Sequence, residues 1–189
     1  GYWRPLTSLA LWLGNSLGGA FGIHVLAWCA HLGATFFAWR IANVLLDGPR
    51  RAFFAALLFG LHPAQVERVA WCSALNDPLF LCCGLAALDA ALRGRDLRAA
   101  VAMLGALLAK ENAIALLPIV AFARWRTAER RAGGLALLGI AAVAWWLLRS
   151  AVFGIAGGLD HTNVDPVVAS HWSTGALELF GRELGQVVW

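Results

Sequence analysis

The sequence predicts an all-α protein, a polytopic transmembrane helical bundle with short half-spanning helix pairs and interfacial helices. Hydrophobic residues make up 60% of the 189 residues and charged residues only 14%, whereas soluble domains average about 45–50% and about 25%. Mean hydropathy is +0.69. Apolar segments of helical length alternate with short basic turns, which is typical of a chain that crosses a membrane several times.

The basic residues predict an orientation. Ten of the fifteen lie in three short turns, at 40–51, 93–98 and 124–131. Because basic loops are retained on the cytoplasmic side, the opposite ends of the helices are expected on the periplasmic or lumenal side, in a bacterial inner membrane or an ER membrane. The basic residues form no continuous patch, so membrane lipids and not nucleic acid are the expected partners.

The chain is expected to form one partial transmembrane domain over residues 1–189. Residues 1–19 are predicted to be an external loop with an interfacial helix, and residues 20–153 to hold the transmembrane helices. Residues 154–174 are polar and glycine-rich and predict a second external loop, and residues 175–189 the start of a further helix. Because the chain begins at Gly1 and ends within an apolar stretch, we expect it to be an internal piece of a longer protein.

Within the transmembrane part, residues 20–46 are long enough to cross a bilayer, which needs about 20 helical residues. Residues 52–61 are too short to span alone, and residues 64–76 are amphipathic. Residues 97–109 and 113–122 are predicted to run out and back, with a polar tip at Lys110 and Glu111 that lines a cavity or is buried in protein.

Two further predictions concern this region. One continuous helix over residues 97–123 is the alternative to the out-and-back pair, but it would place Arg98 and Arg124 on opposite sides of the membrane. Residues 133–153 predict another span.

Polar residues gather at the predicted non-cytoplasmic ends of the helices. Two cations, Arg4 and Lys110, could hold a lipid phosphate, since charge-assisted bonds to phosphate are strong. Three carboxylates, Glu67, Asp77 and Glu111, could bind a divalent ion or accept a proton from an attacking hydroxyl. Ionisable groups at membrane depth are costly and usually functional.

Structural roles remain open for the same residues. Lys110 beside Glu111, and Glu67 beside Arg68, could be local pairs that cap helix ends, and His62 before Pro63 could simply shape a turn. The other polar residues favour structural contacts: interhelical hydrogen bonds for His24 and His31, and a cytoplasmic-edge pair for Asp89 and Arg93.

Four motifs occur in order: Arg4-Pro5-Leu6-Thr7, Gly22-Ile23-His24, His62-Pro63 through Glu67, and Ala109-Lys110-Glu111. In these motifs the chain resembles the membrane region of GT-C superfamily proteins akin to the tetratricopeptide-containing O-mannosyltransferases and their bacterial relatives. The resemblance covers roughly residues 1–125. Two positions depart from the family pattern: Asn76 precedes Asp77 where a basic or small residue is usual, and Ala27 stands in place of Asn.

The resemblance implies a membrane glycosyltransferase of GT-C type that transfers a mannose-like hexose from a polyprenyl-phosphate-linked donor to a protein or glycan acceptor. It implies substrate-binding roles for Arg4, His62 and Lys110, and catalytic roles for Glu67, Asp77 and Glu111. The main catalytic Asp of such enzymes is expected upstream of Gly1, and tetratricopeptide repeats elsewhere. The metal ligands are unknown; Mg²⁺ or Mn²⁺ is a candidate cofactor. A transporter or flippase-like carrier and a non-catalytic membrane scaffold are the alternatives.

Overall fold

The computed structural model describes residues 3–127 and 131–153, and every regular element in these ranges is helical. The predicted all-α class is therefore confirmed. Within these ranges, three segments are long and apolar enough to cross a membrane: Pro5–Leu45, Cys72–Leu92 and Ala132–Val152. The chain divides into two compact units, Gly1–Leu148 and Arg149–Trp189, and the packing below belongs to the first. The predictions for residues 154–174 and 175–189 lie outside the described residues.

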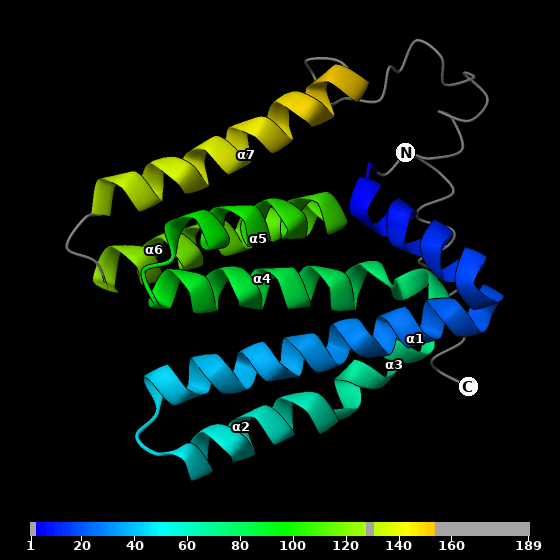
Figure 1. Ribbon diagram of the computed structural model, residues 1–189, viewed down its shortest axis with the longest axis horizontal. Coiled ribbons are helices and arrows are strands. Elements are labelled where there is room, and N and C mark those ends of the chain that lie inside the picture. The colour runs from blue at the N-terminus through cyan, green and yellow to red at the C-terminus, as the bar shows by residue number, and fades with distance from the viewer. Residues whose placement is uncertain (1–2, 128–130, 154–189) are drawn as a thin grey trace, which may run out of the picture. The chain divides into compact units, whose positions relative to one another are not determined.

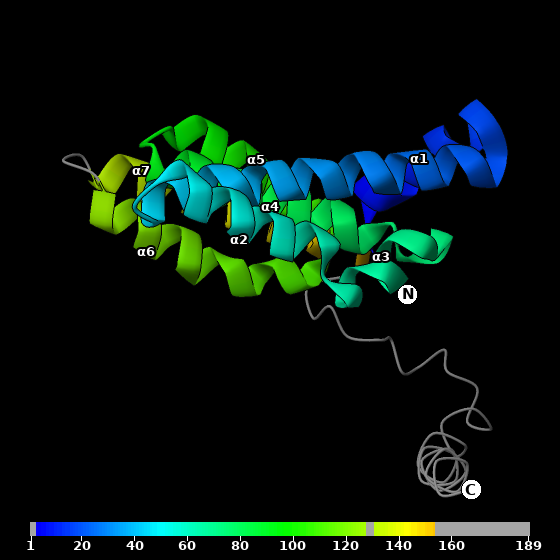
Figure 2. The ribbon, with the colours of Figure 1, turned by 90° about the horizontal axis from the view of Figure 1, so that it is seen from below.

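The elements follow in the order α1 (Pro5–Leu45), α2 (Pro49–Leu61), η1 (Pro63–Gln65), α3 (Val66–Ala70), η2 (Cys72–Ala74), α4 (Asn76–Leu92), α5 (Asp96–Ala109), η3 (Glu111–Leu116), α6 (Leu117–Thr127) and α7 (Arg131–Phe153). Helix α1 packs against α2 and α4, and α4 packs against α5 (Figures 1 and 2). Prolines begin α1, α2 and η1, where a missing backbone N–H costs no helical hydrogen bond.

Helix α1 is two arms joined at a kink, visible in Figure 1 as a sharp bend. Gly19 has φ +59°, a conformation that favours glycine. The arms then touch through Gly14 and Gly22: a Cβ at Gly22 would lie 2.1 Å from the Gly14 carbonyl oxygen. The bend separates residues 5–17 from the long arm and returns the start of the chain towards the core, where Trp3 packs.

The interior is built from small side chains. Ala27 and Ala34 of α1, and Ala87 and Ala91 of α4, are fully buried, whereas large side chains such as Phe21 (75% exposed) point outwards. Small residues at helix interfaces let backbones approach closely, which is how helices associate in lipid. Met103 and Leu107 of α5 with Leu138 and Trp145 of α7 complete the core.

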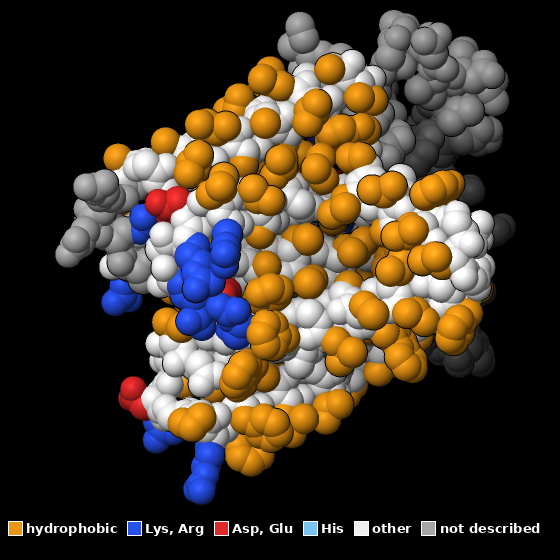
Figure 3. All heavy atoms as spheres, in the orientation of Figure 1, with side chains coloured by type: hydrophobic (Ala, Val, Ile, Leu, Met, Phe, Trp, Pro, Cys, Tyr) orange, Lys and Arg blue, Asp and Glu red, His pale blue; other side chains and the backbone are white. Residues whose placement is uncertain are grey.

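The basic turns lie together at one end of the first unit, where blue side chains gather in Figure 3. Asp89 of α4, with 5% of its side chain exposed, forms ion pairs with Arg40 of α1 at 3.0 Å and Arg93 at 2.8 Å. Arg124 of α6 holds Asp96 of α5, and this guanidinium lowers the pKa of the Asp96 carboxyl. Carboxylates thus tie the ends of four helices in two pairs, α1 with α4 and α5 with α6, and Asp89 pairs with Arg93 as predicted.

Two sequence expectations about helix extent are resolved here. The continuous helix over residues 97–123 is wrong, because the backbone of Lys110 is extended (φ −155°, ψ 131°) and separates α5 from η3. The amphipathic residues 64–76 form short helical turns, which an extended Trp71 (φ −98°, ψ 113°) separates.

Replacing Asp89 by Ala is expected to destabilise the fold by about 3–5 kcal/mol, because it leaves two partly buried arginines without their shared carboxylate. Thermal unfolding in detergent, followed by tryptophan fluorescence, measures the loss. Asp47→Ala, which removes an exposed carboxylate in the α1–α2 turn, is the control and should change stability by less than about 0.5 kcal/mol. Equal effects of the two substitutions would contradict the role given to Asp89.

Gly22→Ala is expected to lower stability by about 1–3 kcal/mol, since the added methyl group overpacks the contact with Gly14. Gly139→Ala in α7 is the matched control, because nothing lies within 4 Å of its Cβ position, and a helical Gly→Ala change gains up to about 1 kcal/mol. The melting temperatures should therefore move in opposite directions. A Gly22→Ala protein as stable as the parent would show that the arms of α1 do not pack closely.

Candidate functional site

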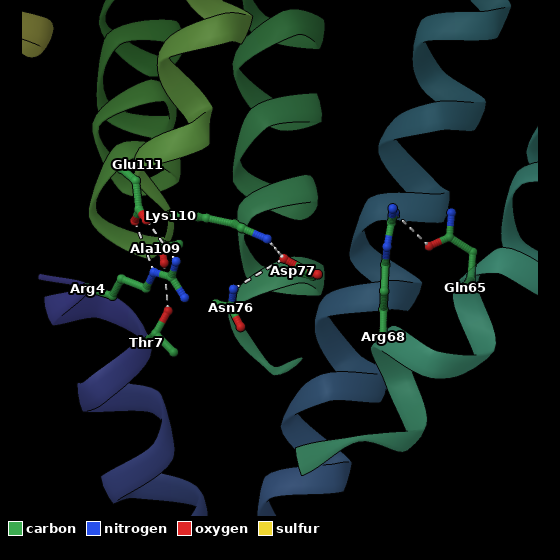
Figure 4. A network of polar contacts seen from close by, with 9 residues as sticks. All are labelled: Arg4, Thr7, Gln65, Arg68, Asn76, Asp77, Ala109, Lys110 and Glu111. Carbon is green, nitrogen blue, oxygen red and sulfur yellow. Dashed lines mark hydrogen bonds and ion pairs between the residues drawn. The ribbon is translucent and has the colours of Figure 1, made fainter. Parts of the chain in front are cut away.

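Four of the predicted site residues meet at the end of the helices opposite the basic turns: Arg4, Asp77, Lys110 and Glu111 (Figure 4). We call them the ion-pair cluster. They come from the start of α1, the first turn of α4, and the junction between α5 and η3. Between 21% and 25% of each side chain is exposed, so the cluster is sheltered by protein and still reachable from outside.

Arg4 binds Glu111 with a two-pronged geometry. Its Nε donates to Oε2 of Glu111 at 3.0 Å and its Nη2 donates to Oε1 at 2.8 Å. Bidentate guanidinium–carboxylate pairs of this kind combine two charge-assisted bonds in a fixed orientation. One helical turn further on, the Thr7 hydroxyl donates to the carbonyl oxygen of Ala109 at 2.9 Å. The first arm of α1 is thereby fixed to the end of α5.

Whereas Glu111 pairs with Arg4 at the start of α1, Lys110 pairs with Asp77 of α4. The Asn76 side chain also donates to Oδ1 of Asp77, at 3.2 Å. Helix α5 ends at Ala109, and the extended backbone of Lys110 directs two consecutive side chains to different neighbours. The alternative of a local Lys110–Glu111 pair is therefore wrong: each residue pairs with a distant partner.

The cluster balances two positive charges with two negative ones. An ammonium group carries three N–H donors, and one of those of Lys110 meets Asp77. Within the described part of the chain, its other two donors have no hydrogen-bond acceptor. An anion at this place could therefore be bound by Lys110 directly, and by Arg4 in competition with Glu111.

His62 and Glu67 lie apart from the ion-pair cluster. His62 is the N-cap of η1, and its Nδ1 accepts a hydrogen bond from the Ala64 backbone N–H at 3.1 Å, so the turn-shaping alternative describes its contact. Glu67 is exposed on α3, and its neighbour Arg68 bonds Gln65 at 3.5 Å and not Glu67. Figure 4 shows Gln65 and Arg68 separated from the two ion pairs.

The predicted interhelical roles of His24 and His31 are confirmed by their contacts. Nε2 of His31 lies 3.0 Å from the Gly60 carbonyl oxygen of α2, and Nε2 of His24 lies 3.1 Å from Sγ of Cys72. Thr7 and Asn76 also make contacts at the site, and the sequence had given neither residue a role. Thr7 could have been found, because it lies three residues after Arg4 and hence on the same helical face.

The described residues offer no ligand set for the candidate divalent ion. Across residues 3–127 and 131–153, no three His, Cys, Asp or Glu side chains are grouped so that they could hold a metal. Asp77 and Glu111, the carboxylates of the cluster, each face a cation instead.

Part of the chain is similar to proteins named protein O-mannosyl-transferases. It is 30% identical over 124 residues to F38B6.6 of Caenorhabditis elegans, covering 62% of this chain and 18% of that protein. It is 32% identical over 126 residues to Tmtc1 of Drosophila melanogaster, covering 62% and 15%. With Tmtc2 of the same fly the identity is 37% over 73 residues, covering 37% and 8%.

The chain thus spans less than a fifth of the length of these relatives. No family model matches it, and no solved structure does. The similarity supports a relationship to glycosyltransferases, and the apolar helices support an integral membrane protein.

A double-mutant cycle on Arg4→Ala and Glu111→Ala tests the pairing. Because the pair is bidentate and partly buried, we expect a coupling free energy of about 1–3 kcal/mol in unfolding. The control cycle pairs Arg4→Ala with Glu67→Ala, which should be additive within about 0.5 kcal/mol. Additivity in the first cycle would show that Arg4 and Glu111 do not interact in the folded protein.

Proposed function

We propose that the chain is part of a membrane glycosyltransferase of GT-C type, which transfers a mannose-like hexose from a polyprenyl-phosphate-linked donor to an acceptor. The observation that carries this proposal is the ion-pair cluster: two cations and two carboxylates, partly exposed, at the end of the helices opposite the basic turns. The similarity to O-mannosyl-transferases supports it. By the positive-inside rule, the face would be periplasmic or lumenal.

In this proposal Lys110 and Arg4 bind the donor phosphate. A phosphate presents several acceptor oxygens and the same sign of charge as the carboxylates that already face these cations. It can therefore bind the remaining donors of Lys110 and compete with Glu111 for the guanidinium of Arg4. Before the donor arrives, Asp77 and Glu111 compensate the cations and keep their side chains oriented.

The transfer would break the bond between the anomeric carbon and the phosphate oxygen, and form a bond from the acceptor hydroxyl oxygen to the same carbon. The electron pair of the broken bond leaves with the phosphate, and cations held in place stabilise that growing negative charge. The hydroxyl proton passes to a carboxylate. Asp77 and Glu111 are the carboxylates of the cluster, and the resemblance implies a further Asp upstream of Gly1.

Glu67 and His62 take a different place in the proposal. They lie apart from the cluster, on η1, α3 and their connection to α2, so we give them no part in holding the phosphate. An acceptor that approaches from the side of α3 would meet Glu67, which is exposed.

Transfer from a labelled polyprenyl-phosphate mannose by the full-length protein tests the assignment. Lys110→Ala is expected to lower kcat/KM by about 100-fold or more, the effect of removing one group that stabilises developing charge. Lys110→Arg should recover part of the activity, because the positive charge returns. Arg98→Ala, at an exposed position beside the α4–α5 turn, is the matched control and should transfer normally.

Full transfer by Lys110→Ala would overturn the site assignment. Binding of the lipid-linked sugar without transfer to any protein or glycan acceptor, by the unaltered protein, would favour the carrier alternative instead.

A further inference from the structure

An apolar groove runs along the long arm of α1, away from the ion-pair cluster. Its volume is about 740 Å³, within the range of about 300–1,000 Å³ that is usual for ligand clefts. One wall is formed by Phe21, Val25 and Trp28 of α1. The other comes from the end of α2 and from α3, which follow each other along α1 (Figure 2).

The groove is held open by two hydrogen bonds of its own lining residues. His31 joins α1 to the Gly60 carbonyl of α2, and His24 joins α1 to Cys72 of η2. The two histidines are seven residues apart and so lie on one face of α1, two turns from each other. The wall opposite α1 is therefore tied to α1 at the end of α2, and the chain that follows α3 is tied to α1 through Cys72.

The lining is apolar and uncovered within the described part of the chain. Phe21 is 75% exposed, Trp28 62% and Leu61 74%. Helix α1 is one of the candidate membrane spans among the described residues, and apolar side chains exposed on such a span are suited to contact hydrocarbon. A hydrocarbon chain fits this surface better than any polar molecule.

The polar lining residues of the groove are His24, His31, His62 and Gln65, and a cation, Arg68, lies beside the last of these. Gln65 and His62 line the groove, and Arg68 donates to the Gln65 side chain at 3.5 Å. The lining itself includes no Asp, Glu, Lys or Arg, so Arg68 contributes its charge from outside the lining, through its contact with Gln65. A ligand complementary to these surfaces has a hydrocarbon chain and an anionic head, because the guanidinium binds phosphate oxygens well.

We propose that this groove is a binding site for an anionic phospholipid, with an acyl chain between α1 and α2–α3 and the headgroup phosphate at Arg68. The site is separate from the ion-pair cluster and does not depend on the proposed transfer reaction. A bound lipid would cover Phe21 and Trp28 and brace α3 against α1.

Native mass spectrometry of the full-length protein in detergent, supplemented with phosphatidylglycerol or phosphatidylcholine, tests this. We expect one retained phosphatidylglycerol and about tenfold weaker retention of phosphatidylcholine, because the choline cation next to the same phosphate is repelled by the guanidinium of Arg68. Arg68→Gln should weaken phosphatidylglycerol retention by a similar factor, and Arg68→Lys should largely preserve it.

Two substitutions on α1 separate groove binding from general lipid adhesion. Val25→Trp fills the groove and should remove the retained lipid, whereas Val44→Trp, exposed on the same helix outside the groove, should leave it. Equal retention of the two lipids, retention by Val25→Trp, or equal loss in both Trp variants would each overturn the proposal. Retention of polyprenyl phosphate but not phosphatidylglycerol would also overturn it and assign the groove to the donor lipid.

Discussion

Two neighbouring residues of opposite charge organise the end of the helices that carries the ion-pair cluster. Lys110 and Glu111 follow the last residue of α5, and the backbone between them leaves the helix. If α5 continued, their side chains would project about 100° apart on one helix. Instead Lys110 reaches α4 and Glu111 reaches α1. Three helix ends are thereby joined by charged groups that are costly to leave unpaired where little water reaches them.

The same arrangement explains how a strongly apolar chain can carry a polar site. The body of the first unit is held by alanine-rich contacts between close-packed helices, which need no polar groups. The charged residues are confined to the two ends, with Asp89 and Asp96 joining arginines at one end and Asp77 and Glu111 joining cations at the other. The ion pairs at the first end join helices to one another. At the second end, Lys110 has N–H donors beyond its bond to Asp77 that an anion could use.

Much of this architecture could be predicted from the sequence. Hydropathy and the basic turns predict the helices and their alternating direction, because both follow from the chain's own composition. The partners in the ion pairs could not be predicted in the same way. Lys110 and Glu111 are adjacent in sequence, and they contact different helices only because the backbone at Lys110 is extended. The motif order grouped Glu67 and His62 with the cluster, but the breaks at Pro63 and Trp71 place them on separate short turns. Proximity along the chain says little about proximity across broken helices.

The bend at Gly18 and Gly19 also bears on the order of assembly. Arg4 is synthesised before its partner Glu111, which lies 107 residues later, after the helices from α2 to α5. Long-range contacts of this kind close late, because the intervening chain must be in place before they form. The contacts that fix the first arm of α1, from Arg4 and Thr7 to Glu111 and Ala109, thus all reach across the sequence of the intervening helices. The Arg4–Glu111 pair of the cluster can therefore form only in a chain that already contains the helices from α2 to α5.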